Sequence, residues 1–147
     1  MKLVDIEETI VLVTGTSLPA EERDRPLAYQ LKAEIDRRGA GHAYRRAVVV
    51  ADAWYLENRT FHLNPTIAIG GPGVNGVTQE FTAFLPTVYS RDDAVFVQVD
   101  FEGELKRAAL WGANTASTAA AVEVFTTQGQ LDDLLGKVWR FRVGTFV

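Results

Sequence analysis

The chain contains no cysteine and only two histidines among its 147 residues. The absence of cysteine excludes disulfide bonds, thiolate nucleophiles and cysteine-based zinc or iron–sulfur centres. Neither His42 nor His62 has a second histidine or a carboxylate at the spacing of a metal site, so the sequence predicts no bound metal. A Gly-x-Ser-x-Gly elbow is also missing, which argues against a serine hydrolase.

The sequence also lacks an excess of positive charge and a long hydrophobic run. Its formal net charge is -4, whereas a protein that binds nucleic acid without sequence preference needs a basic face. No apolar run approaches the length that spans a bilayer, and the start of the chain turns acidic at residues 5–8, where a signal peptide would become apolar. We therefore expect no nucleic-acid or membrane partner and a cytoplasmic location.

What is present is the composition of an ordinary globular protein. Hydrophobic residues make up 47% of the chain and charged residues 23%, which is far from the signature of disorder. The length suits one domain with one core. No internal repeat, low-complexity tract or linker divides the sequence, so residues 1–147 are predicted to form a single α/β domain.

Short apolar runs alternate along the chain with segments of helical periodicity. The runs at 9–14, 46–53 and 66–69 are typical of buried strands. Helices are predicted where apolar residues recur at helical spacing, namely at 24–39, from Asn75 through Val88, at 119–125 and at 131–138. Segment 54–62 fits either an extension of the second strand or a loop that covers the sheet.

The second half of the chain contains one predicted antiparallel hairpin. Residues 94–101 and 104–111 flank Glu102-Gly103, which has the composition of a tight turn. The fold expected from these elements is a three-layer, mixed but mainly parallel sheet with helices on both faces, flavodoxin-like or Rossmann-like in general architecture. The alternating tail at 140–147 suits an edge strand or a contact between copies of the chain.

The most informative segment is the glycine-rich turn at 69–75, between a predicted strand and a predicted helix. Glycines at such a junction let another group approach the main chain, and a helix N-terminus offers unpaired N–H donors and a partial positive charge. In mainly parallel sheets, ligands bind where the loops at the carboxyl ends of the strands gather. We expect that edge to be built from loops that begin at Gly15, Gly70 and Gly112, with Asp52 beside them.

Several known patterns do not fit these loops. The glycine turn has neither the spacing of the dinucleotide fingerprint nor the Gly-Lys-Ser/Thr of a P-loop. Residues 11–17 resemble the opening of short-chain dehydrogenases, in which a strand ends in Thr-Gly. However, 18–21 lack the glycines that follow in that family, and the chain has no Tyr-x-x-x-Lys pair. The resemblance carries no activity over to this chain, and the sequence identifies no cofactor.

The leading hypothesis is a domain that binds a small anionic or polar ligand at the carboxyl edge. Its predicted ligand-binding residues are two glycines that supply main-chain donors, two threonines that supply hydroxyls, and two further polar side chains: Gly71, Gly73, Thr16, Thr115, Asp52 and Asn75. One alternative is a structural or self-association module, a homo-oligomer joined through the tail, in which these loops are only well-capped turns. The third and lowest-ranked hypothesis is an enzyme that uses Asp52 as acid or base, and no complete catalytic set accompanies that residue.

Overall fold

The computed structural model of the chain describes residues 5–139 and contains a six-stranded sheet in the order β2-β1-β3-β6-β5-β4. The strands are β1 (Ile10–Thr14), β2 (Ala47–Ala51), β3 (Thr66–Ile69), β4 (Thr87–Arg91), β5 (Val95–Asp100) and β6 (Arg107–Gly112). The helices are α1 (Leu18–Arg23), α2 (Arg25–Arg38), α3 (Asp52–Glu57), the 3-10 helix η1 (Arg59–Leu63), α4 (Gly76–Phe81), α5 (Thr115–Thr127) and α6 (Gln130–Val138).

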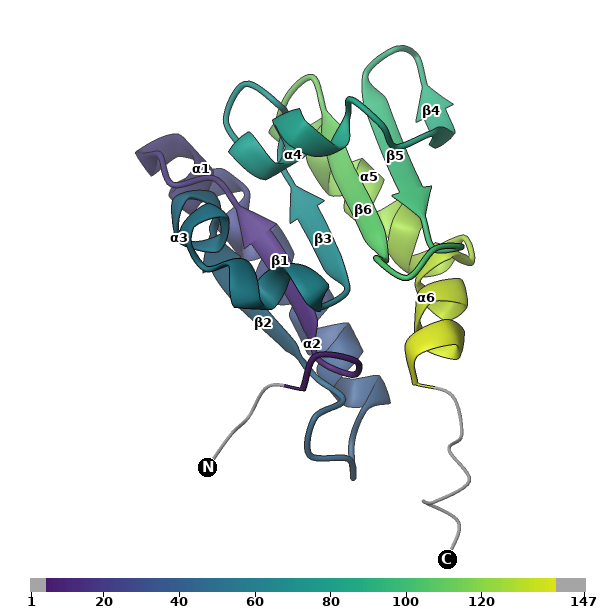
Figure 1. Cartoon of the computed structure of the whole chain (residues 1–147). Coiled ribbons are helices and arrows are strands. Elements are labelled where there is room, and N and C mark those ends of the chain that lie inside the picture. The colour runs from purple at the N-terminus through teal and green to yellow at the C-terminus, as the bar shows by residue number, and fades with distance from the viewer. Residues whose placement is uncertain (1–4, 140–147) are drawn as a thin grey trace, which may run out of the picture.

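The sheet is mixed and mostly parallel. Strand β1 pairs in parallel with β2 and with β3, and β3 pairs in parallel with β6. Strand β5 runs antiparallel to both β6 and β4, so the last three strands form a meander. The carboxyl ends of β1, β2, β3 and β6 therefore share one edge of the sheet, which is the upper edge in Figure 1.

Successive residues of the central strands belong alternately to two apolar clusters, because side chains of a strand point alternately to opposite sides. Ile10 and Leu12 of β1 pack in the larger cluster, together with apolar residues of α2, α5 and α6. Val11 and Val13 pack in the smaller cluster with Tyr55 of α3 and residues of α4. All four residues of β1 named here are fully buried, which explains why this strand reads as a continuous apolar run.

The structure corrects the predicted helix between Asn75 and Val88. Helix α4 begins after Asn75 as expected but ends at Phe81, and Val88 lies in strand β4. The predicted single hairpin is therefore part of a three-stranded meander. Most residues of β4 are exposed, and Pro86 precedes it, so neither alternation nor an apolar run marks it in the sequence.

Other elements also differ from the sequence-based expectation. The second strand ends at Ala51 rather than continuing to Ala53, because α3 starts at Asp52. The segment whose structure was left open, 54–62, contains the rest of α3 and most of η1. Residues 18–23, where the sequence predicts no helix, form the short helix α1. Proline occupies its first turn, and Ser17 accepts a hydrogen bond from the N–H of Ala20.

The tail at 140–147, predicted to form an edge strand or a contact, lies outside the described residues. Within residues 5–139, no helix has both the length and the apolar composition needed to cross a membrane.

Candidate functional site

The loops at the carboxyl edge approach one another closely enough to require glycine. A Cβ atom on Gly15, at the end of β1, would lie 2.0 Å from the carbonyl oxygen of Val74, in the loop before α4. A Cβ on Gly71 would lie 3.8 Å from the carbonyl oxygen of Gly112, at the end of β6. The three loops that the sequence singled out are therefore neighbours at one end of the molecule.

A hollow of about 390 Å³ opens at this edge. Its walls are α1, the β3–α4 loop and the β6–α5 junction, which lie at the same end of the molecule in Figure 1. The lining residues used below are Arg23, Asp24, Gly71, Gly73, Trp111, Asn114, Thr115 and Thr118. The hollow has the size of a small-ligand site.

Three of the six predicted ligand-binding residues line this hollow: Gly71, Gly73 and Thr115. Within residues 5–139, the main-chain N–H groups of these residues have no hydrogen-bond acceptor. Thr115 is the first residue of α5, and Asn114 caps that helix by accepting a hydrogen bond of 2.9 Å from the N–H of Ser117. The hollow is thus bordered by free backbone donors at a helix N-terminus.

Asn75, by contrast, is a structural residue of this edge. Its side chain is 1% exposed. The amide nitrogen donates to the carbonyl oxygens of Val13 and Ile69, each at 3.0 Å, which ties the ends of β1 and β3 together. The amide oxygen accepts from the N–H groups of Val77 and Thr78 and so caps α4. No hydrogen-bonding group of Asn75 is left for a ligand.

Thr16 and Asp52 bind each other rather than lining the hollow. The Thr16 hydroxyl donates to Asp52 Oδ1 at 2.5 Å. The same carboxylate accepts from the N–H of Ala53 at 2.8 Å, and its other oxygen accepts from the N–H of Gly76 at 2.7 Å. Asp52 therefore joins the start of α3 to the start of α4, and both of its oxygens already have protein donors.

Asp24 lines the hollow from the junction of α1 and α2, although no sequence pattern marked it as a site residue. Asp24 is 6% exposed, and its carboxylate has no hydrogen-bond or ion-pair partner within the described part of the chain. Burial raises the pKa of this carboxyl above its ordinary value, and the positive charge of Arg23 opposes that shift. A buried acid with a perturbed pKa in a hollow is a common property of functional sites.

Gly70 provides the space that this carboxylate occupies. A Cβ on Gly70 would lie 2.6 Å from Asp24 Oδ2, and Gly70 also has a positive φ of 114°. The positive φ favours glycine at this position, and a Cβ there would force the Asp24 carboxylate to move. The sequence identified the glycine but gave no sign of its partner, because Asp24 reads as an ordinary helix cap. In the structure Asp24 has helical φ and ψ and makes no capping bond, since it continues from α1 into α2.

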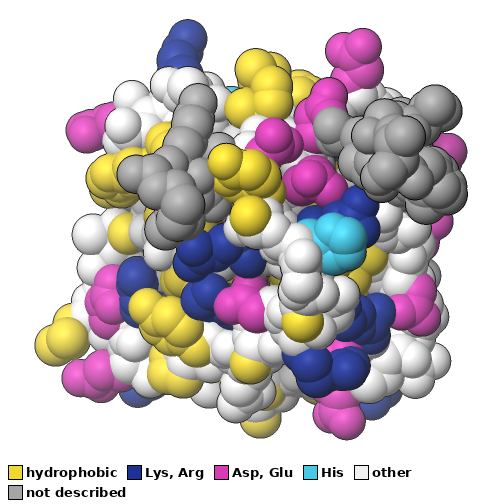
Figure 2. Space-filling model, turned by 90° about the horizontal axis from the view of Figure 1, so that it is seen from below, with side chains coloured by type: hydrophobic (Ala, Val, Ile, Leu, Met, Phe, Trp, Pro, Cys, Tyr) yellow, Lys and Arg dark blue, Asp and Glu magenta, His cyan; other side chains and the backbone are white. Residues whose placement is uncertain are grey.

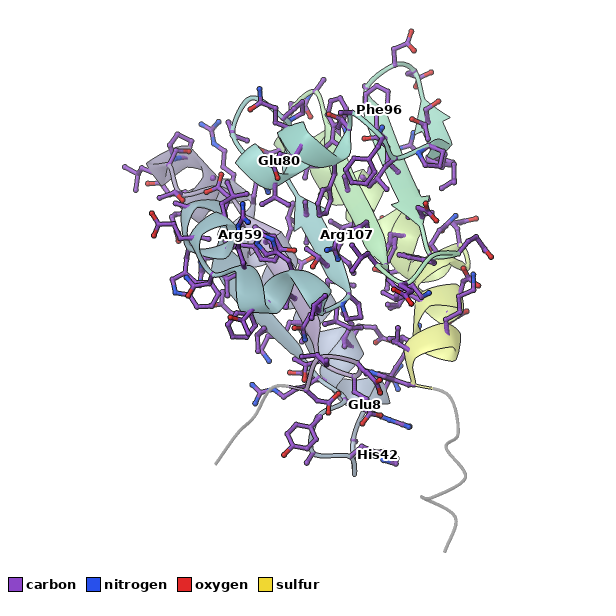
Figure 3. The ribbon with its side chains drawn as sticks, viewed as in Figure 1. Glu8, His42, Arg59, Glu80, Phe96 and Arg107 are labelled. Atoms are coloured by element: carbon purple, nitrogen blue, oxygen red, sulfur yellow. The ribbon has the colours of Figure 1, made fainter. Side chains whose placement is uncertain are left out.

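A second buried charge, Arg107, lies in the interior at the start of β6, away from the hollow (Figure 3). Its guanidinium donates to the carbonyl oxygens of Asn64, at 3.0 Å, and of His62. It also lies 5.5 Å from the ring centroid of Phe81. Burial lowers the pKa of Arg107. Arg107 therefore has a structural role, because its hydrogen bonds fix the segment that precedes β3.

Neither histidine belongs to the site. The ring of His62 is stacked on Tyr55 and is 2.7 Å from the carbonyl oxygen of the same residue, whereas His42 lies near the lower end of the molecule (Figure 3). Within residues 5–139, no three acidic or histidine side chains are grouped as metal ligands would be.

The lower end, seen in Figure 2, carries mixed charges, including the ion pair of Arg45 with Glu8 at 2.6 Å. A larger groove of about 710 Å³ lies among the residues Ile6, Leu63, Leu105 and Lys137. None of the polar side chains that line this groove is buried. The upper hollow is therefore the better candidate, since it alone of the two contains a buried polar group without a partner.

No protein-family model matches the chain, and no curated protein matches it at a significant level.

Proposed function

We propose that this protein binds a small anionic or polar ligand in the hollow at the carboxyl edge of its sheet. The observation that carries the proposal is the meeting of Gly71, Gly73 and Thr115 around one hollow with main-chain N–H groups that have no acceptor. Such groups bind anions in many proteins, because they donate hydrogen bonds without requiring a charged side chain.

Two further features favour an anionic group at this position. Helix α5 has 13 residues, so its N-terminus presents a partial positive charge to the hollow. Arg23 lines the hollow from α1 and is exposed, which allows its guanidinium to meet a ligand from the solvent side. In this proposal, Thr16, Asp52 and Asn75 act indirectly, by holding the loops, rather than as direct ligand contacts.

The proposal is tested by filling the hollow. Gly73 has no atom within 4 Å of the position of a Cβ, so Gly73→Phe places a ring in open space without a backbone clash. Gly103, in the turn between β5 and β6, has equally open surroundings, and Gly103→Phe is the matched control. Inorganic phosphate, nucleotides and dicarboxylates serve as probes in thermal-shift and calorimetric titrations.

The expected result is binding of at least one probe class to the wild type and to Gly103→Phe, and its loss in Gly73→Phe. Absence of any binding by the wild type, or equal binding by both variants, would overturn the proposal.

We also infer that the architecture is three-layered, with helices on both faces, and Rossmann-like or flavodoxin-like in general. The inference is supported by the two apolar clusters, one shared with α2 and α5 and the other with α3 and α4. It is further supported by the strand order, in which the chain leaves β1 toward β2 and later returns to β3 on the opposite side of β1. An experimental structure in which one sheet face lacks helices would contradict it.

Self-association is a second proposal, favoured by strand β2. This strand lies at an edge of the sheet, consists of Ala and Val only, and has four of its five residues partly exposed. Edge strands without charge are templates for pairing with another chain. The tail at 140–147 is the segment proposed to pair across such an interface.

An acid–base role for Asp52 ranks below both, because its two oxygens already accept hydrogen bonds from Thr16, Ala53 and Gly76. Once an activity is known, full activity of Asp52→Asn would remove this hypothesis.

A further inference from the structure

The carboxylate of Asp24, a residue that is 6% exposed, has no hydrogen-bond or ion-pair partner within residues 5–139. The charged side chains among the described residues lining the hollow are Asp24 and Arg23. Arg23 lowers the pKa of Asp24 through its charge, but it forms no ion pair with Asp24 in the structure. Burial of the residue raises the pKa of the Asp24 carboxyl, so its ionised form is less stable here than on an exposed side chain.

Two of the donors in the hollow are already committed to other acceptors. Trp111 donates its indole N–H to Gln98 at 2.8 Å. The Thr118 hydroxyl donates to the carbonyl oxygen of Asn114 at 3.1 Å and accepts from the N–H of Gly112. Within residues 5–139, no group of the chain donates a hydrogen bond to the Asp24 carboxylate. A bound ligand can therefore be the partner of this acid.

The packing around Asp24 fixes the position of its carboxylate. Gly70 leaves the space into which Oδ2 fits. The residue is held at the junction of two helices, with its backbone N–H donating to the carbonyl oxygen of Ala20 at 2.9 Å. Thr115 and Gly73, with their free N–H groups, line the same hollow. The residue whose carboxylate can bind a cation and the residues whose N–H groups can bind an anion thus line one hollow.

We infer that the ligand is a small zwitterion, whose ammonium group binds the carboxylate of Asp24 while its anionic group binds the free N–H groups of the β3–α4 loop and of α5. This inference rests on the proposed function, and it adds an ammonium group to the anionic ligand proposed there. Hydrogen bonds between an ammonium and a carboxylate are charge-assisted and about twice as strong as neutral ones. The ammonium group would be an ion-pair partner for the Asp24 carboxylate, which has none within the described residues.

The inference is tested with pairs of probes that differ only by the amine. Phosphoethanolamine is compared with ethyl phosphate, and L-glutamate with glutarate, in calorimetric titrations at several pH values. We expect the amine-bearing member of at least one pair to bind about tenfold to a hundredfold more tightly. The preference should grow as the pH rises through the pKa of Asp24, because the ionised carboxylate is the form that accepts the ammonium group.

Asp24→Asn should abolish this preference and its pH dependence, since the amide keeps the shape but not the charge. Asp100→Asn is the matched control: Asp100 is exposed at the end of β5, opposite Arg107, and thus at the other edge of the sheet. Circular dichroism and thermal melting of both variants verify that each is folded.

The outcomes separate the two claims. If the amine-free probes bind as tightly as their partners and Gly73→Phe removes that binding, the zwitterion inference is wrong while the proposed function stands. Tighter binding at low pH, or an unchanged amine preference in Asp24→Asn, would also overturn the inference. If no probe binds at all, both fail.

Discussion

At the scale of single residues, Asp24 shows how a group can weaken the fold that contains it. Burial raises its pKa above the ordinary value of 3.8, so the folded state binds a proton more readily than the unfolded chain. The stability associated with the protonated acid is complete below pH 3.8 and is lost as the pH rises through the folded-state pKa. The residue therefore costs stability at neutral pH.

We predict that Asp24→Asn increases the free energy of unfolding at pH 7 by about 1 kcal/mol, because the neutral amide replaces a charge whose desolvation on burial is unfavourable. The advantage should shrink as the pH falls and vanish near pH 3.8, where the wild-type acid is neutral. Urea unfolding of both proteins at a series of pH values measures it. A difference that stays constant across that series would contradict the assignment.

Asn75 illustrates the opposite case, a polar residue whose every group is used. We predict that Asn75→Ala lowers the free energy of unfolding by about 2–4 kcal/mol, because it removes a helix cap and two buried hydrogen bonds to the carbonyl oxygens of Val13 and Ile69. Asn114 caps α5 on the exposed surface, and Asn114→Ala should cost about 1 kcal/mol. Equal losses in urea unfolding would mean that the buried bonds of Asn75 contribute nothing.

At the scale of elements, the important feature is the contact between the β1–α1 turn and the β3–α4 loop. Gly15→Ala places a methyl group 2.0 Å from the carbonyl oxygen of Val74. We predict a loss of about 1–3 kcal/mol, as for other overpacked sites. Gly73→Ala, with open space around it, should change stability by less than about 0.5 kcal/mol. Thermal or urea unfolding of the two variants side by side tests whether the loops are as tightly packed as described.

The elements that could be predicted from the sequence are those with a strong local signal. Strands β1 and β3 are continuous apolar runs, and α4 begins directly after Asn75. The apolar pattern predicted a start of α5 at residue 119, although this helix begins at Thr115. Strand β4 gave no such signal, because it is an edge strand exposed along most of its length. Helix α1 was missed because Pro19 suggests a loop, although proline is favoured in the first turn of a helix.

At the scale of the whole molecule, the sequence could predict the edge at which the loops meet but not the contents of the hollow. The edge follows from parallel strands and their carboxyl-terminal loops. Asp24 enters the hollow only because α1 and α2 are nearly continuous and because Gly70, distant in sequence, leaves space for its carboxylate. Thr16 and Asp52 were predicted ligand-binding residues because they are polar and follow strands. In the structure the Thr16 hydroxyl donates a hydrogen bond to Asp52. Such pairings depend on tertiary distances that no local pattern encodes.

The self-association proposal also belongs to this scale. We predict that the full chain has the mass of an oligomer in solution and that a chain ending at Trp139 has the mass of a monomer. Light scattering coupled to size-exclusion chromatography measures both. A full-length chain that is already monomeric, or an oligomer that survives the truncation, would show that residues 140–147 do not join copies of the chain.

The network around Asn75 and Asp52 has a consequence for recognition. The Asn75 amide joins β1, β3 and α4, and the Asp52 carboxylate joins α3 to α4. These bonds hold the β3–α4 loop in place without a ligand. A ligand that binds to preorganised loops loses little affinity, because few protein groups have to become ordered on binding. Discrimination among guests should then depend on geometric fit and charge placement rather than on closure of the protein around them.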